Sequence, residues 1–214
     1  MQKKFRTRND YLTLTPFQQK GGSAFMKLYG KTVLFLGSSV TYGSAAGGVS
    51  FADLMAESCG IVCIKEAVSG TTLADTNRKS YVARLKKVNA DTKVDLFICQ
   101  LSTNDAAKKI PLQKTEDAIR FILQYAEDTF ACPILFYTGT YFESEAYEAM
   151  IHLLYDLQKE YDFYILDLFN DKTMQGISPD LYKKYMHDPV HPTFVGYKEW
   201  WTPKFITFCE SLTE

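Results

Sequence analysis

The sequence has little of what marks a membrane protein, a secreted precursor or a nucleic-acid-binding protein. No apolar run approaches the ~18 to 20 residues that a membrane-spanning helix needs. The amino-terminal stretch is basic at first but lacks the apolar core of a signal peptide. Lysine and arginine total 24 against 25 acidic residues, so there is no basic excess to bind a phosphate backbone. We therefore expect no membrane span, no nucleic-acid partner and a location in the cytoplasm.

The cysteines are not spaced as they are in metal sites or disulfide frameworks. The cysteines number five, an odd count, and none lies in a Cys-x-x-Cys spacing. Cys59 and Cys63 lie on either side of a predicted helix-to-strand junction, which suits a zinc site poorly. We expect buried, reduced thiols and predict no structural metal. The five positions are Cys59, Cys63, Cys99, Cys132 and Cys209.

The composition is that of an ordinary globular protein. With 214 residues, of which 46% are hydrophobic and 23% charged, the chain is long enough to bury a sizeable core. We expect one domain over residues 31–214. Residues 1–30 are predicted to be an N-terminal extension that packs on this domain or on a neighbouring chain, and the sequence leaves homo-oligomerisation open.

Five short apolar runs predict buried β-strands. Each is almost continuously hydrophobic instead of alternating, as is typical of parallel strands covered on both faces. We therefore interpret all five as central strands of a parallel sheet. The runs cover residues 32–37, 61–67, 94–101, 133–139 and 163–169.

Helical patterns lie between these runs. Apolar residues recur at steps of three and four over 114–130 and 144–161. Another helix is predicted after Ser50, with Asp53 completing a capping box. A last helix is expected over 194–212, with a kink or break at a proline within it. The alternation predicts a three-layer α/β sandwich with right-handed crossovers.

The residues that follow the strands deserve most weight, because ligands of such sheets bind beyond the carboxyl ends of the strands. Ser39 follows the first run, Gly70 the second and Asn104 the third, and the segment before the last helix supplies Asp188 and His191. A serine nucleophile needs a base, and the base needs a carboxylate that orients it. The backbone N–H groups of Ser39 and Gly70 and the Asn104 amide could hold an oxyanion. These residues predict acyl transfer.

These segments resemble the four sequence blocks of the SGNH or GDSL hydrolases. The blocks are GSSVTYG, SGTT, STND and DPVHP, in that order, and the resemblance extends from residue 32 to about 200. It implies a flavodoxin-like three-layer α/β/α sandwich with five parallel strands in the order 2-1-3-4-5. It also implies a metal-independent serine esterase that cleaves small acyl esters, acetylated sugars or lipids without a cofactor.

The resemblance implies a role for each site residue. Ser39 would be the nucleophile, His191 the base and Asp188 its orienting carboxylate. The N–H groups of Ser39 and Gly70, with Asn104, would form the oxyanion hole. The sequence departs from the family pattern twice, with Ser38 in place of the usual aspartate and Ser102 in place of the usual glycine.

Simpler interpretations stay open for single residues. Ser38 could compete with Ser39 as the nucleophile, and Asp105 could cap a helix. Gly37 and Gly43 are expected to let the first loop turn sharply and approach the substrate closely. His187 is a spare candidate base and His152 is expected on a solvated helix face. We expect Trp200 and Trp201 to pack the last helix, and Tyr42, Tyr141 and Phe142 to line a pocket.

Two other functions are compatible with the same loops. A flavodoxin-like module could use the Ser/Thr-rich first loop to bind the phosphate of a flavin or nucleotide. An acyltransferase could use the same serine, histidine and aspartate with an alcohol in place of water.

Overall fold

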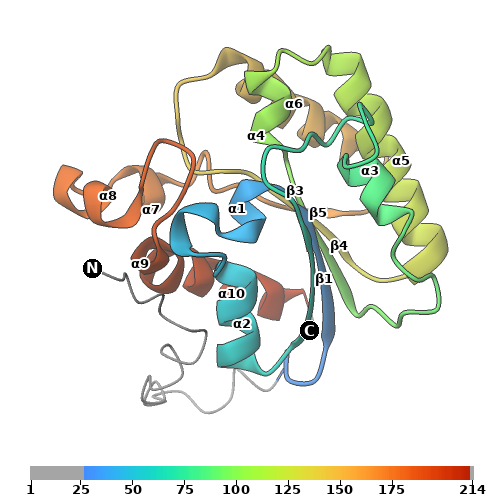
Figure 1. The fold of residues 1–214 in the computed structure, drawn as a ribbon, viewed down its shortest axis with the longest axis horizontal. Helices are drawn as coiled ribbons and strands as arrows, with labels where there is room; N and C mark the ends of the chain where they lie inside the picture. The colour runs from blue at the N-terminus through green and yellow to red at the C-terminus, as the bar shows by residue number, and fades with distance from the viewer. Residues whose placement is uncertain (1–26, 213–214) are drawn as a thin grey trace, which may run out of the picture.

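Five parallel strands form one sheet in the order β2-β1-β3-β4-β5 (Figure 1). The protein is represented by a computed structural model that describes residues 27–212. Every neighbouring pair of strands is parallel, which confirms the fold class and strand order expected from the sequence. The strands are β1 (Thr32–Gly37), β2 (Val62–Ala67), β3 (Leu96–Gln100), β4 (Ile134–Tyr137) and β5 (Tyr164–Leu166).

The prediction that all five strands are central is wrong for β2 and β5. Within residues 27–212, each of these two strands pairs with one neighbour, because they form the edges of the sheet. Val62 is 54% exposed and Tyr164 is 40% exposed, whereas β3 and β4 are buried throughout. The apolar runs therefore located the strands correctly but did not distinguish edge from centre.

Helices cover both faces of the sheet. In Figure 1, α2 and α10 lie on one face, and α3, α5 and α6 lie on the other. The helices are α1 (Ser39–Tyr42), α2 (Phe51–Cys59), α3 (Tyr81–Leu85), α4 (Thr103–Ala107), α5 (Leu112–Phe130), α6 (Glu145–Leu157), α7 (Lys172–Gln175), α8 (Pro179–Tyr185), α9 (Phe194–Gly196) and α10 (Thr202–Ser211), with a 3-10 turn η3 (Ser44–Ala46) and a π-helical turn η4 (Tyr197–Trp201).

The predicted signals at the ends of two helices are confirmed. The Ser50 N–H donates to the Asp53 carboxylate at 2.8 Å, and the Ser50 hydroxyl caps the first turn of α2. The last helical region is interrupted by the π-helical turn η4, after which α10 begins. Pro203 lies in the first turn of α10, directly after η4, which agrees with the break expected at this proline.

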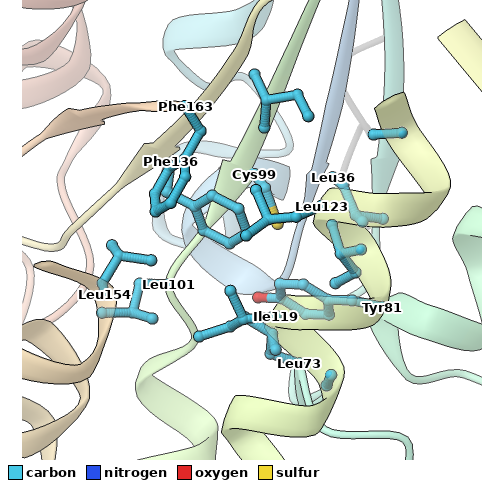
Figure 2. Packing of buried hydrophobic residues seen from close by; sticks show 14 of the residues in the cluster. Leu36, Leu73, Tyr81, Cys99, Leu101, Ile119, Leu123, Phe136, Leu154 and Phe163 are labelled. Atoms are coloured by element: carbon cyan, nitrogen blue, oxygen red, sulfur yellow. The ribbon is translucent and has the colours of Figure 1, made fainter. Parts of the chain in front are cut away.

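The two faces of the sheet carry two hydrophobic cores. Leu34 and Leu36 of β1 point to the α3, α5 and α6 side, while Val33 and Phe35 point to the α2 and α10 side. Figure 2 shows the first core, where Tyr81, Ile119 and Phe136 are among the packed side chains. Such packing on both faces fixes the positions of the strand ends.

The second core is rich in aromatic rings. Phe51 of α2 stacks on Phe205 of α10 with ring centroids 3.8 Å apart, and Trp201 is fully buried beside them. Leu28 also belongs to this core and is 1% exposed. The packed region therefore begins before residue 31, and the rest of the expected N-terminal extension, residues 1–26, lies outside the described residues.

Candidate active site

Ser39 begins α1 directly after the end of β1, in a turn that the neighbouring strands hold in place. The Ser38 N–H and the Thr41 hydroxyl both donate to the Gln100 side-chain oxygen at 2.9 Å. Thr41 Oγ1 also lies 2.7 Å from the hydroxyl of Tyr137. Ser39 itself is 8% exposed. The turn is thus fixed from β3 and β4, and the Ser39 side chain keeps a small opening to solvent.

The expectation for Gly37 was wrong in its physical reason. A Cβ atom at Gly37 would lie 1.7 Å from Thr41 Oγ1 and 2.9 Å from the side-chain oxygen of Gln100. Gly37 is therefore required because the polar network packs against its backbone, and its φ is not in the left-handed region. Gly43 does have a left-handed φ of 85° and closes α1, as the sequence predicted.

Ser39, His191 and Asp188 form a continuous hydrogen-bonded chain. Ser39 Oγ lies 2.8 Å from His191 Nε2, and His191 Nδ1 lies 2.8 and 2.9 Å from the two carboxylate oxygens of Asp188. An ionised carboxylate only accepts hydrogen bonds, so Nδ1 of the neutral imidazole carries the proton and Nε2 accepts one from Ser39. This geometry suits removal of the serine proton by the histidine.

The turn that carries the histidine organises itself around Asp188. The N–H groups of Val190 and His191 both donate to one Asp188 oxygen at 2.8 Å. The His187 N–H donates to the His191 carbonyl at 2.8 Å, which closes the turn at its base. Burial raises the pKa of Asp188, but the hydrogen bonds from Val190 and His191 outweigh it and leave the pKa below the usual value.

The lowered pKa of Asp188 predicts a pH-dependent contribution to stability. The ionised carboxylate stabilises the fold above its unfolded-state pKa, and this contribution is lost as the pH falls through the lower folded-state pKa. Asp188→Asn should therefore unfold at a lower urea concentration than the wild type near neutral pH, and the gap should narrow below about pH 4. Urea titrations of both proteins across this range test the prediction, and a gap that widens in acid would contradict it.

Gly70 and Asn104 lie in the segments that follow the two strands beside β1. Gly70 follows β2 and Asn104 follows β3, and these strands flank β1 in the sheet. The Asn104 amide nitrogen donates to the Thr71 carbonyl at 2.9 Å, so the two segments meet. Gly70 has a left-handed φ of 76°, which favours glycine there. Neither the Ser39 nor the Gly70 N–H donates a hydrogen bond among residues 27–212, which leaves both for a ligand.

Asp105 has a role that the sequence interpretation missed. It does not cap its own helix: its carboxylate accepts from the N–H groups of Leu73 and Ala74 at 2.7 and 2.9 Å. The residue is fully buried, and burial raises its pKa while these hydrogen bonds oppose the shift. Through these hydrogen bonds, Asp105 links the loop that contains Gly70 to α4, the helix that contains Asn104.

The structure separates the other candidates from this site. Ser38 is fully buried, and its hydroxyl lies 3.3 Å from the side-chain oxygen of Gln100, so it is not placed to attack a substrate. The His187 side chain is exposed and makes no hydrogen bond within the described part of the chain. His152 lies on the exposed side of α6, as expected.

The aromatic candidates divide between core and surface. Phe142 packs with Tyr147 and Phe169, and Tyr42 is 44% exposed beside Lys65. Of the three residues expected to line a pocket, Tyr141 lines both of the hollows described below.

A hollow of about 300 Å³ lies near the turn that carries Asp188 and His191. Thr140 Oγ1 is 4.0 Å from the sulfur of Met186, which forms a β-bridge with Pro192 next to His191. A second hollow of about 230 Å³ shares Tyr141 with the first. Ser39, Asp188 and His191 are not among the lining residues of either hollow. The first is lined by Thr140, Tyr141, Met174, Gln175, Tyr182 and Trp200.

Neither the cysteines nor the acidic residues form a metal site in the described region. All five cysteines are free, three of them buried and two half-buried. Among residues 27–212, no three His, Cys, Asp or Glu side chains gather in a way that could hold a metal ion. Over the same residues, no helix combines the length and apolar character that crossing a bilayer requires.

Comparison with known proteins assigns the family. The model of the GDSL-like lipase/acylhydrolase family matches residues 35–199, so the chain belongs to this family and is a carboxylic ester hydrolase. The sequence-based resemblance is thereby confirmed. A search of the curated proteins finds no match.

Several solved structures share the fold. A protein from Lactobacillus plantarum is 20% identical, with a TM-score of 0.69 over 86% of this chain and 98% of its own. An esterase of the SGNH-hydrolase family is 23% identical, with a TM-score of 0.58 over 86% and 97%. An acetylxylan esterase from Geobacillus stearothermophilus is 18% identical, with a TM-score of 0.63 over 86% and 96%.

Proposed function

We propose that this enzyme is a serine esterase that works through an acyl-enzyme on Ser39. The observation that carries the proposal is the continuous chain of hydrogen bonds from Ser39 Oγ through His191 to Asp188, at 2.8 to 2.9 Å. A serine hydroxyl is a weak nucleophile until a base removes its proton, and His191 is in position to be that base. Asp188 holds the imidazole in the tautomer that the reaction needs.

The proposed reaction has two halves. Ser39 Oγ attacks the ester carbonyl carbon while His191 Nε2 takes the hydroxyl proton. The tetrahedral intermediate then expels the alcohol, which leaves with that proton, and an ester of Ser39 remains. Water attacks this acyl-enzyme with His191 again as the base, and the carboxylic acid departs as Ser39 regains its proton.

The negative oxygen of each tetrahedral intermediate needs hydrogen-bond donors. The N–H groups of Ser39 and Gly70 and the second N–H of the Asn104 amide are proposed to supply three of them. Two observations support this assignment. The sheet order sets the strands before Gly70 and Asn104 on either side of β1, which leads to Ser39. A hydrogen bond from Asn104 to Thr71 joins the two segments that follow these strands. Donors that are already in place need no reorganisation during the reaction.

For the substrate we propose short acyl esters of hydroxyl-rich alcohols, with acetylated sugars as the leading class. The first hollow, near the turn that carries Asp188 and His191, combines aromatic side chains such as Tyr141 and Trp200 with polar groups such as Gln175. Aromatic rings can stack on the faces of a sugar ring, and polar groups can bind its hydroxyls. The similarity in fold to an acetylxylan esterase makes that class the natural one to try first.

Hydrolysis of a series of esters tests this function. We expect turnover of p-nitrophenyl acetate to exceed that of the octanoate ester, and acetate to be released from acetylated xylo-oligosaccharides. Tyr141→Ala should lower kcat/KM for the acetylated sugar about 2- to 10-fold and leave p-nitrophenyl acetate unchanged. Tyr164→Ala, at an exposed tyrosine of β5, is the matched control. Preference for octanoate would instead indicate a lipid substrate.

We also propose a single domain in the cytoplasm. One sheet contains all five strands, and both cores pack against it, which supports one domain over residues 31–214 together with Leu28. The free cysteines support a reducing compartment.

A further inference from the structure

Arg84 is a buried cation that the proposed reaction does not use. It lies in α3 and is 6% exposed. Its guanidinium donates to the carbonyls of Gly37 at 2.7 Å and Lys79 at 3.0 Å, to the carbonyl of Glu66, and to the hydroxyl of Thr71 at 3.4 Å. All four acceptors are neutral. A charge buried without a bonded carboxylate is costly, so its place among these particular groups needs an explanation.

Three of the four acceptors of Arg84 lie in the segments that carry the proposed oxyanion donors. Glu66 and Thr71 lie on either side of Gly70 in the chain, and Gly37 lies two residues before Ser39. One guanidinium therefore contacts both ends of the loop that carries one proposed oxyanion donor and the strand end that carries the other. The Thr71 hydroxyl in turn donates back to the loop, to the Val68 carbonyl at 2.7 Å.

We infer that Arg84 is a positioning residue that fixes the Ser39 and Gly70 N–H groups relative to each other. This inference rests on the proposed function, because it assigns Arg84 to the oxyanion hole of that reaction. Arg84 touches neither the nucleophile nor the base. It acts through the backbone of β1 and β2, whose carboxyl ends it joins, and through Thr71, whose carbonyl is held by Asn104.

The geometry requires arginine and not merely a positive charge. The guanidinium is planar and presents five N–H donors in fixed directions, which lets Arg84 reach two strand ends and a side chain at once. A lysine ammonium is a single point with three donors. It could satisfy some of these acceptors but could not hold Gly37, Glu66 and Thr71 in one arrangement.

Arg84→Lys tests the inference. We expect kcat for p-nitrophenyl acetate to fall about 10- to 100-fold, because small displacements of catalytic groups have effects of this size, while KM changes little. Arg120→Lys is the matched control, since Arg120 forms ion pairs with Glu116 and Glu160 on the surface of α5. Full kcat in Arg84→Lys would overturn the inference.

A double-mutant comparison separates positioning from a general structural role. Arg84 and Asn104 act on the same hole, so their effects should not multiply. In an Asn104→Ala background we expect Arg84→Lys to lower kcat by less than about 3-fold. The same loss in both backgrounds would contradict a shared action and leave Arg84 a purely structural residue.

A second variant keeps the test decisive if Arg84→Lys does not fold. Thr71→Val retains the side-chain shape but removes the hydroxyl that Arg84 contacts, and we expect a fall in kcat of about 3- to 10-fold. Unchanged kcat in that variant would overturn the inference. Activity that survives Ser39→Ala would instead overturn the proposed function, so the two failures are distinguishable.

Discussion

Ser39→Ala and His191→Ala are each expected to reduce kcat for p-nitrophenyl acetate by about 10⁴-fold or more. Alanine at position 39 removes the attacking oxygen, and alanine at position 191 removes the base that lies 2.8 Å from it. Loss of either member of such a unit costs nearly as much as loss of both. The double variant should therefore be hardly slower than either single one. Initial rates at saturating substrate provide the measurement.

Matched controls for this prediction lie close to the site in sequence. His187→Ala removes an exposed histidine four positions before His191, and Ser44→Ala removes an exposed serine in η3. Both should retain wild-type activity, and circular dichroism should show the same fold for all variants. If His187→Ala lost activity and His191→Ala kept it, the base would be His187, and the assignment of His191 would be wrong.

Asn104→Ala is expected to lower kcat about 10²- to 10³-fold, the usual effect of losing one oxyanion donor. The structural cost should be small, because the side chain makes one hydrogen bond to Thr71, worth about 1 kcal/mol. KM should change little, since the donor acts mainly on the charged intermediate. Kinetics and urea unfolding of the same preparation separate the two effects.

Asn89→Ala is the matched control for this second prediction, because Asn89 is exposed in the loop after α3. Its kcat should equal that of the wild type. If Asn104→Ala kept full activity, the amide would have no part in the oxyanion hole, and the bond to Thr71 would be structural only.

Much of the architecture could be predicted because burial leaves a strong pattern in the sequence. The run over 32–37 coincides with β1, and the periodic stretch 114–130 falls within α5 (Leu112–Phe130). Short helices such as α1 and α4 have four or five residues, which is too few for a helical period to register. They form because the strand ends and the polar networks beneath them fix the chain.

The site was predictable only where it coincides with the family's sequence blocks. Ser39 and His191 lie 152 positions apart, so no local pattern could bring them together. Asp105 and Arg84 were missed because a charged residue in a short helix is typical of a solvated face, and their burial depends on distant loops. Gln100 did leave a signal: it is the one polar residue within the stretch 96–101, and such residues are unusual in a core.

The most direct test of the account is to find the atom that becomes acylated. An organophosphonate should inactivate the wild-type enzyme at one equivalent, and peptide mass spectrometry should locate the adduct on Ser39, with none formed in Ser39→Ala. An adduct on another residue, such as Ser38, would contradict the assignment of the nucleophile. Absence of any adduct from a protein that hydrolyses p-nitrophenyl acetate would contradict the acyl-enzyme mechanism itself.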